Sequence, residues 1–574
     1  MKTLNHSFDF CVIGGGLAGM CAAVAAARHG IQTALIHDRP VLGGNASSEI
    51  RMWICGAHGK NMRETGIIEE ILLENRFRNP EYSYAQWDAL LYEKVAFQEN
   101  LTLFLNCSCT NARMAGERID AVEAWQLTTE TWHIVKAQYF ADCSGDSILA
   151  PLSGAEFRLG REASSEFNES IAPAETDDRS MGMSCLIQAR ETERPQRFCP
   201  PPWAYRYDSD EDLPNRDHGI RSNFWWLEIG GEADSVHAAE ENRDELLKIA
   251  YGVWDHVKNR GEHGLENWVL DWVGFLPGKR ESRRYIGDHV LTQNDVEAEG
   301  RFHDIVAYGG WTMDDHHPAG FRHPGNPTTH YPAPSPFGIP YRCLYSRNIE
   351  NLFFAGRNIS ATHAAMSATR VMATCAVIGQ AVGTAASLAS KHKSSPRGVG
   401  EIYLEDLQQQ LLRDDCFLPW YRRTIGPVLE AAELISDQGD PELLRSGVDR
   451  PFEDVDNAWK TEMGGTLEIR FKQPRRLQGL RLVFDSDLKG NYHNMPAMRP
   501  LDLPPASLPP ALVRNFRVEV ADNAGTWREA AEVTDNHQRL VRLDLSGVEA
   551  SALKLTVDSS WGEKIVKIFA IDVE

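Results

Sequence analysis

The chain has 574 residues, of which 59 are Lys or Arg and 81 are Asp or Glu, so its formal net charge is −22. A surface with this charge repels nucleic-acid phosphates and anionic lipids, which excludes nucleic acid and membrane as expected partners. The 11 cysteines are scattered and none follows Cys416, so no disulfide framework is indicated and a reducing, cytoplasmic location is expected.

Two further classes are not expected. Met1 to Ser7 is polar and runs directly into an apolar segment, which leaves no room for a signal peptide, and we expect no later run of about 18 apolar residues that could span a bilayer. Cys107 and Cys109 alternate in an apparent strand, where such cysteines usually pack, and the sequence therefore predicts no metal site.

The first motif is an apolar run that stops at a glycine-rich turn. Residues 8–13 read FDFCVI and are typical of a buried parallel strand. Gly14, Gly16 and Gly19 follow with the G-x-G-x-x-G spacing, in which the first glycine allows the turn, the second lets a pyrophosphate approach the backbone and the third lets a helix pack on the strand. A glycine-rich turn in another α/β fold is the alternative.

The next elements complete a dinucleotide-binding unit. Met20 to His29 is rich in alanine and predicts a helix whose N-terminus faces the phosphates, and Thr33 to Ile36 predicts the second strand. An acidic residue is expected near the end of this strand to bind the ribose hydroxyls, and the spacing falls on His37 or Asp38. We choose Asp38; a surface His-Asp pair is the alternative.

The sequence resembles a family of FAD-dependent oxidoreductases that share a glutathione-reductase-type flavin fold. The stretches that carry the resemblance are GGGLAG at 14–19, DRPVLGGNASSEIR at 38–51, YFADCSGD at 139–146, GKRESRR at 278–284, and residues 351–383. Together they span most of residues 8–390, and their joint pattern is more specific than any one of them. The resemblance implies a Rossmann-like α/β domain with FAD as cofactor.

Further cofactor positions follow from the same motifs. Gly43 and Gly44 remove side chains where backbone could lie against the cofactor, and Asn45 and Ser48 offer polar groups to it. The resemblance implies that Asp146 lies near the pyrophosphate, although an ordinary Asp-Gly turn is the alternative. It also implies that an apolar strand from Leu352 that ends in glycine at Gly356, and a helix over 367–388, return to the flavin through Gly356, Arg357, Asn358 and Thr369.

Residues 155–306 interrupt the regular alternation of strands and helices. A triple proline at 200–202, an acidic run at 208–212 and several tryptophans mark an inserted α+β domain. In the resembling flavoproteins the corresponding segment is a substrate domain that covers the flavin. Each tryptophan is expected to be a core residue, with stacking on a sugar ring as the alternative.

Two groups of residues are candidates for catalysis. Arg280 and Arg284 could bind oxygen atoms of a substrate or counter the charge of a reduced flavin, and a solvated charge run is the alternative. His316 and His317 lie in a long polar, proline-rich loop and could accept the proton of a substrate hydroxyl.

The C-terminal part predicts an all-β module. From residue 465 onward apolar residues alternate with polar ones, as in half-buried antiparallel strands of a jelly-roll sandwich. The module resembles the galactose-binding-like or discoidin-type sandwich, with Trp459, Trp527 and Trp561 as stacking candidates if they are exposed together. A structural or dimerising role is equally compatible. The expected organisation is 1–154 and 307–400 for the FAD-binding domain, 155–306 for the inserted domain, 401–440 for a helical linker and 441–574 for the sandwich.

These features favour an FAD-dependent oxidoreductase that transfers hydride between the flavin and a small polar substrate, a sugar or glycoside secondary alcohol. The alternatives are a fumarate-reductase-like ene-reductase acting on a carboxylated alkene, and a non-catalytic carbohydrate-binding protein. No second dinucleotide motif identifies the electron acceptor, so oxygen, a quinone or a protein partner stay open, as does a homo-oligomer.

Overall fold

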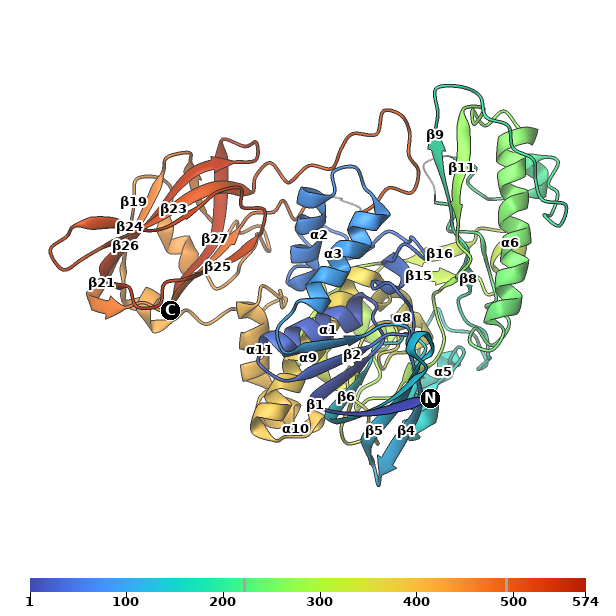
Figure 1. The fold of residues 1–574 in the computed structure, drawn as a ribbon, viewed down its shortest axis with the longest axis horizontal. Helices are drawn as coiled ribbons and strands as arrows, with labels where there is room; N and C mark the ends of the chain where they lie inside the picture. Colours follow the sequence, from blue (N-terminus) through green and yellow to red (C-terminus); the bar gives the residue numbers. More distant parts are fainter. Residues whose placement is uncertain (220–222, 491–493) are drawn as a thin grey trace. The chain divides into compact units, whose positions relative to one another are not determined.

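The computed structural model describes residues 1–219, 223–490 and 494–574, which form two compact units (Figure 1). The first unit comprises Met1–His58, Tyr82–Leu407 and His493–Pro505. The second unit comprises Gly59–Glu81, Gln408–Tyr492 and Ala506–Glu574. Each unit is therefore assembled from three segments that are far apart in the chain. Each unit contributes a segment that lies, in the sequence, within the span of the other, so the units do not follow one another along the chain.

A mostly parallel sheet forms the centre of the first unit. Its strands follow the order β3 (Leu101–Phe104), β2 (Thr33–Ile36), β1 (Lys2–Ile13), β6 (Thr131–Asp142), β5 (Arg118–Gln126) and β4 (Cys107–Ala115), and β18 (Leu352–Phe354) also pairs with β6. Strands β1, β2, β3, β6 and β18 are parallel, and β4 to β6 form an antiparallel meander. This is the predicted Rossmann-like arrangement. Residues 101–115 form two separate strands, β3 and β4, because the chain turns at Asn106, which has a φ of 51°.

Two helices pack against each other beside this sheet (Figure 1). They are α1 (Leu17–Arg28) and α9 (Met372–His392). A Cβ atom on Gly379 would lie 2.0 Å from the carbonyl oxygen of Ala18, and one on Gly383 would lie 2.1 Å from that of Ala22. The two helices therefore meet backbone to backbone.

Helix α9 corrects two expectations from the sequence. By length and composition it is apolar enough to cross a membrane, but 89% of its most apolar window is buried inside the protein. The single helix expected over 367–388 is divided into α8 (His363–Thr369) and α9, because Val371 has an extended backbone with a φ of −66° and a ψ of 145°. The N-terminus of α9 therefore lies at Met372.

The segment 155–306 consists of short strands around one long helix. Its helices and longer strands are α5 (Ser164–Phe167), β9 (Ile187–Glu191), α6 (Ala239–Asp255), β11 (Trp268–Val273) and α7 (Gln293–Glu297). Its two-residue strands are β7 (Phe157–Arg158), β8 (Met183–Ser184), β10 (Glu228–Ile229), β12 (Gly278–Lys279) and β13 (Arg284–Tyr285). Figure 1 shows α6 alongside β9 and β11. Trp226, Trp254 and Trp268 are buried in the core between them, as expected, whereas Trp203 is exposed and Trp225 and Trp272 are half-buried.

The polar loop expected at 311–340 contains regular structure. Strand β15 (Met313–His316) pairs with β16 (Thr328–Tyr331), and β14 (Ile305–Gly309) pairs with β17 (Phe337–Pro340). These antiparallel pairs fix the backbone on which the candidate histidines are placed.

The remaining helices belong to both units. They are α2 (Ile67–Arg78), α3 (Tyr84–Ala96), α4 (Leu149–Ser153), α10 (Pro396–Ile402), α11 (Leu404–Arg413) and α12 (Pro427–Ala431). Helix α2 lies in the second unit, where Leu73 joins the apolar core.

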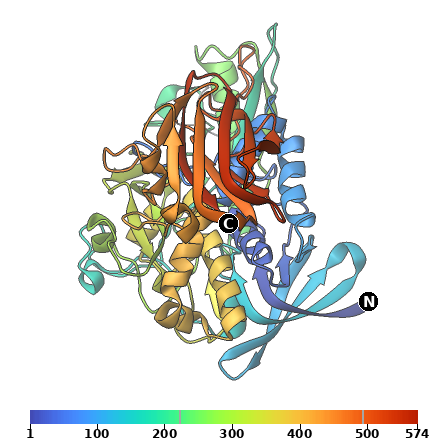
Figure 2. The ribbon, with the colours of Figure 1, turned by 90° about the vertical axis from the view of Figure 1, so that its left-hand side faces the viewer.

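Two antiparallel sheets form the sandwich of the second unit, which Figure 2 shows in orange to red. One has the order β19 (Glu433–Ser436), β21 (Thr466–Arg476), β26 (Glu549–Ser560), β23 (Val513–Ala521) and β24 (Trp527–Val533). The other has the order β20 (Trp459–Glu462), β27 (Ile565–Val573), β22 (Gly479–Phe484) and β25 (Leu540–Asp544). Alternate residues such as Leu467, Ile469, Leu553 and Leu555 fill the core between the sheets, as the alternation predicted.

The three tryptophans of the sandwich do not form one exposed platform. Trp459 is fully buried and its indole nitrogen donates to the carbonyl oxygen of Gln438. The ring of Trp527 is covered by Lys554, and that of Trp561 by Arg514. The structure thus does not meet the condition on which a common stacking role depended.

Candidate functional site

A cleft of about 490 Å³ follows the carboxyl ends of the parallel strands. The glycine turn at 14–16, the segment 37–39 after β2, Gly43 to Asn45, the turn at 143–146 and Gly356 all line it. Helix α1 begins directly after Gly16, which has no side chain that could accept a hydrogen bond from the first N–H groups of the helix. Those groups and the positive end of the helix dipole therefore suit an anion in the cleft.

Glycine occupies three positions of the turn for different physical reasons. Gly14 has a φ of 104°, and a Cβ atom there would lie 2.5 Å from the backbone of Cys143 and Ser144. A Cβ atom on Gly19 would lie 1.8 Å from the carbonyl oxygen of Gly14, so only glycine lets α1 approach the turn. At Gly16 a Cβ atom would meet only the Cα of Gly44, at 3.8 Å, and the space beyond belongs to the cleft.

His37 stabilises the glycine turn instead of presenting a charge to a ribose. Its Nδ1 accepts a hydrogen bond from the N–H of Gly15 at 3.0 Å, and its Nε2 donates to the carbonyl oxygen of Val41 at 3.0 Å. Burial lowers the pKa of His37 to about 4, so the ring is neutral at neutral pH. Asp38, which is exposed and also lines the cleft, is the nearby acidic side chain.

Asp146 belongs to a charged network at the other side of the cleft. Its carboxylate lies 2.7 Å from Nζ of Lys279 and 2.6 Å from a guanidinium nitrogen of Arg357, and it accepts from the hydroxyl of Ser282 at 2.8 Å. Burial would raise the pKa of Asp146, but Arg357 and Lys279 hold it well below its usual range. The anionic Asp146 orients two cations that both line the cleft.

These residues fit an extended dinucleotide. The cleft combines a helix N-terminus, side-chain-free backbone at Gly16 and Gly44, and cations at Lys279 and Arg357. A pyrophosphate requires this kind of lining, because backbone N–H groups and guanidinium groups compensate its charges.

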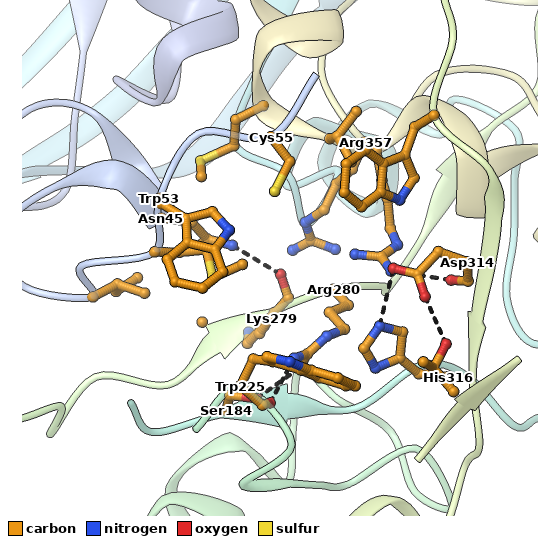
Figure 3. Close-up of a pocket in the computed structure, with 18 of the residues that line it drawn as sticks. Asn45, Trp53, Cys55, Ser184, Trp225, Lys279, Arg280, Asp314, His316 and Arg357 are labelled. Carbon is orange, nitrogen blue, oxygen red and sulfur yellow. Dashed lines mark hydrogen bonds and ion pairs between the residues drawn. The ribbon is translucent and has the colours of Figure 1, made fainter. Parts of the chain in front are cut away.

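A second pocket, of about 250 Å³, adjoins the cleft (Figure 3). Six residues line both cavities: Asn45, Ile50, Lys279, Arg357, Arg370 and Met372. Arg370 and Met372 stand at the break between α8 and α9, so the N-terminus of α9 points to the place where the two cavities meet. A ring bound at that place would face both cavities.

The walls of the second pocket are aromatic on one part and charged on another. Trp53, Trp225 and Trp311 contribute indole rings, while Asp314 and His316 contribute polar groups. Figure 3 shows Trp53 on the side opposite Asp314 and His316. Such a combination suits a ligand that has both a stacking face and hydroxyl groups.

His316 is held between two carboxylates. Its Nδ1 lies 2.6 Å from a carboxylate oxygen of Glu228, and its Nε2 lies 3.3 Å from one of Asp314. Burial would raise the pKa values of both acids. However, Arg280 and His316 lower the pKa of Glu228. His316 and Arg370 likewise lower the pKa of Asp314, to well below its usual range. Two anionic groups therefore flank an imidazole that lines the pocket and would stabilise the charge that it gains with a proton.

Each arginine of the pocket already faces a carboxylate. Arg280 lies 3.3 Å from Glu228, Arg370 lies 3.0 Å from Asp314, and Arg357 is bound to Asp146. Arg280 also donates to the hydroxyl of Ser184 at 2.8 Å. The positive charges at the pocket are thus largely compensated within the protein.

The other two catalytic candidates lie outside both cavities. His317 is exposed, and its ring stacks on that of His323 with centroids 3.7 Å apart. Arg284 is buried with Glu281 and Glu162, so its charge is used inside the protein. His316 and Arg280 line the second pocket, whereas His317 and Arg284 do not. Their positions in the sequence could not make this distinction.

Some expected cofactor residues line neither cavity. Asn358 and Thr369 are fully buried, and the amide of Asn358 donates to Asp142. Ser48 binds the carboxylate of Asp88 through its hydroxyl and through its backbone N–H. The positions Gly14, Gly16, Asp38, Gly43, Gly44, Asn45, Asp146, Gly356 and Arg357 all line the cleft.

Sequence reasoning did not select four residues of the site: Lys279 and Asp314, which lie next to or near the selected Arg280 and His316 in the sequence, and Glu228 and Arg370, which are distant from the selected residues. Glu228 comes from β10 and lies 88 positions before His316 in the chain, and Arg370 lies 56 positions after Asp314. No motif joins residues at such separations. The sequence offered one weak indication, which is that each of the two distant residues is a single charged residue within an apolar stretch.

The chain belongs to the FAD-dependent oxidoreductase family, whose model matches residues 9–411. It is therefore an FAD-dependent enzyme, and the non-catalytic interpretation is set aside. The search of curated proteins found no match.

Similar solved structures include small carbohydrate-binding modules. The family 32 module from Streptococcus pneumoniae EndoD is 17% identical, with 26% of this chain and 97% of that module covered at a TM-score of 0.20. The family 32 module from C. perfringens NanJ, in complex with galactose, is 12% identical, with 25% and 94% covered at a TM-score of 0.19. A Streptococcus pneumoniae fucose-binding module, SpX-3, is 13% identical, with 25% and 93% covered at 0.19. At these values the similarity carries no conclusion about a ligand of this chain.

Proposed function

We propose that this enzyme oxidises a secondary alcohol of a small, uncharged polar molecule, a sugar or glycoside, bound in the pocket of about 250 Å³. In the proposal the cleft beside it holds FAD, with the pyrophosphate at Gly16 and Gly44, the ribose at Asp38, and Lys279 and Arg357 near the phosphates and the ring. When bound, FAD supplies the acceptor for the hydride. The six residues that line both cavities support this placement.

The charges around the pocket favour an uncharged substrate. Arg280, Arg357 and Arg370 each face a carboxylate, so a substrate carboxylate would have to compete with Glu228, Asp146 and Asp314 for them. The indole rings of Trp53, Trp225 and Trp311 offer the apolar faces on which sugar rings commonly stack.

His316 is the proposed base, and its position between Glu228 and Asp314 is the observation that carries the proposal. In the proposed reactive form the ring is neutral, with Nδ1–H donating to Glu228, and Nε2 accepts the proton of the substrate hydroxyl once the hydroxyl takes the place of Asp314 beside it. Asp314 stabilises the resulting imidazolium and is itself held by Arg370 and by Thr328, whose hydroxyl donates to it at 2.6 Å.

The second candidate is an ene-reductase, favoured by the number of cations around the pocket. In that reaction Arg280 would bind the carboxylate of an unsaturated acid after releasing Glu228. Arg284 is not available for this role, because it is buried with Glu281 and Glu162.

Anaerobic flavin spectroscopy separates the candidates. We expect sugars or glycosides to bleach the flavin of the purified holoenzyme, and unsaturated acids to leave the chemically reduced enzyme reduced. His316→Asn should slow bleaching at least 100-fold at saturating substrate, because a positioned base contributes about 10²- to 10⁴-fold.

His317→Asn is the matched control, since it removes the neighbouring imidazole outside the pocket. We expect it to bleach within about twofold of the unmodified enzyme. Equal rates for the two variants would refute the role of His316. Reoxidation of the reduced enzyme by an unsaturated acid, with no bleaching by any sugar, would replace the proposal by the ene-reductase.

A further inference from the structure

A cluster of three histidines and one aspartate lies in the segment 155–306, apart from both cavities. Nδ1 of His218, Nε2 of His256 and Nε2 of His263 lie 3.5, 3.0 and 3.4 Å from the same carboxylate oxygen of Asp210. All four potential ligand atoms lie within 4.8 Å of one another. None of the four residues lines the cleft or the pocket described above.

Two of the three nitrogen-to-oxygen distances, 3.5 Å at His218 and 3.4 Å at His263, match the edges of a metal tetrahedron, and the third, 3.0 Å at His256, is shorter. Zn²⁺ binds imidazole nitrogen and carboxylate oxygen at about 2.0–2.2 Å, which places two ligand atoms of a tetrahedral site roughly 3.3 to 3.6 Å apart. The three rings are also arranged evenly, because each pair of ring centroids is 5.1 Å apart. Side chains that converge in this way around one point are typical of a metal centre.

Hydrogen bonds alone leave the cluster incomplete. Among the described residues, Nε2 of His263 and Nε2 of His218 are buried atoms that have no hydrogen-bond partner. A buried polar atom without a partner costs about 1–3 kcal/mol, and a metal bound by His263 would remove that cost at its Nε2.

The supporting contacts also resemble those of a metal site. The Nδ1–H of His256 donates to the carbonyl oxygen of Tyr207 at 3.1 Å, which directs its Nε2 toward Asp210. Asp210 opens a short helical turn, Asp210–Asp212, that Ser209 caps. His256 starts a π-helical turn, His256–Arg260, at the end of α6, and its side chain is fully buried.

The cluster joins two segments that are distant in the chain. Arg260 already connects them, since it lies 2.8 Å from Asp208 and 2.7 Å from Asp255. We propose that Asp210, His218, His256 and His263 bind one divalent transition-metal ion, Zn²⁺ by preference, which fastens the 207–218 segment to the end of α6. Four protein ligands complete the coordination of zinc, so the role is structural and separate from the redox reaction.

The test measures metal binding by the full-length, tag-free protein after removal of metals with EDTA. We expect one equivalent of Zn²⁺ by mass spectrometry, and Co²⁺ in the same site should give the intense visible absorption of a tetrahedral ion. His263→Ala and His218→Asn change half-buried residues and are expected to weaken Zn²⁺ binding at least 100-fold. His323→Ala removes a half-buried histidine that stacks on His317, away from the cluster, and should bind as the unmodified protein does.

Binding of less than roughly 0.1 equivalent by the unmodified protein would overturn the proposal, because a complete four-ligand site should hold one ion. Equal affinity in His263→Ala and His323→Ala would also overturn it, because the metal would then lie elsewhere. A Co²⁺ spectrum of the weak octahedral kind would contradict the four-ligand site. Flavin bleaching plays no part in these readings, so the result does not depend on the proposed substrate.

Discussion

At Gly16 the backbone has a φ of −68° and a ψ of 175°, a conformation that any residue can adopt. A Cβ atom there would meet nothing closer than 3.8 Å, so Gly16→Leu is expected to fold. The leucine would project into the cleft where we place the pyrophosphate. We expect FAD content to fall at least tenfold while the melting temperature of the apoprotein stays within about 2 °C. Stoichiometric FAD in this variant would contradict the placement.

His37 makes the stability of the folded protein depend on pH. Its pKa is about 4 in the folded protein, below the ordinary value of 6.5, so the unfolded chain binds more protons between these values. The stability that the neutral ring contributes is therefore complete above pH 6.5 and is lost as the pH falls toward 4, to an extent on the order of 3 kcal/mol.

Acidification from pH 7 to about 4 should consequently loosen the glycine turn and release flavin, which fluorescence measures directly. His37→Gln keeps an acceptor for the N–H of Gly15 but does not titrate, so its flavin release should change less over the same range. If both proteins released flavin in parallel, another group would be responsible.

Single residues also show how far the sequence could predict the site. The cofactor turn was predictable because Gly14, Gly16 and Gly19 act within one local strand, turn and helix, where spacing determines geometry. His316 and Arg280 were among the predicted residues, but only the tertiary structure distinguishes them from His317 and Arg284. Glu228 and Arg370 escaped prediction because they meet the site through contacts across 56 to 88 positions.

The four residues of the proposed metal site were not selected from the sequence, and the proposal differs from the prediction of no metal site. Metal motifs are recognised in sequences when ligands lie in short, fixed spacings. Asp210 and His256 are 46 positions apart and meet because α6 folds back on the 207–218 segment. Their convergence depends on packing rather than on local spacing.

At the scale of elements, the contact between α1 and α9 links the core to the cofactor turn. Gly379→Leu would place a side chain within 2.0 Å of the carbonyl oxygen of Ala18, at the beginning of α1. The helices would have to separate, which we expect to cost about 2 kcal/mol or more and to reduce FAD affinity together with the melting temperature. Calorimetry and flavin titration measure the two effects.

Ser390→Val is the control for Gly379→Leu, because it adds apolar volume to the same helix at a half-buried position. It should change the melting temperature by less than about 2 °C. Loss of stability without any change in FAD affinity would show that the helix contact does not reach the turn.

At the scale of the whole molecule, the composition of the two units predicts that deleting the C-terminal sandwich also damages the first unit. Removing residues 440–574 also removes 494–505, which belong to the first unit. There the N–H of Ile54 donates to Asn494 at 3.0 Å and the N–H of Arg499 donates to Ala189 at 3.0 Å. Ile54 stands between Trp53 and Cys55, which line the second pocket.

We therefore expect the 1–439 chain to lose flavin and to melt at least ~5 °C below the full protein. A chain that ends at residue 505 keeps the segment and should retain more flavin than the 1–439 chain, although both lack a complete sandwich. Full flavin content in the 1–439 chain would mean that the segment is dispensable for the first unit.

The same composition of the two units constrains the order in which the protein can mature. A ribosome delivers the chain from its N-terminus, so the pocket wall around Ile54 must wait for Asn494, and helix α2 must wait for partners such as Leu429. Neither unit can complete its folding before most of the chain has been synthesised, because both contain residues that follow position 493. Unlike a cassette appended by gene fusion, this sandwich could not be transferred to another host protein without leaving a gap behind.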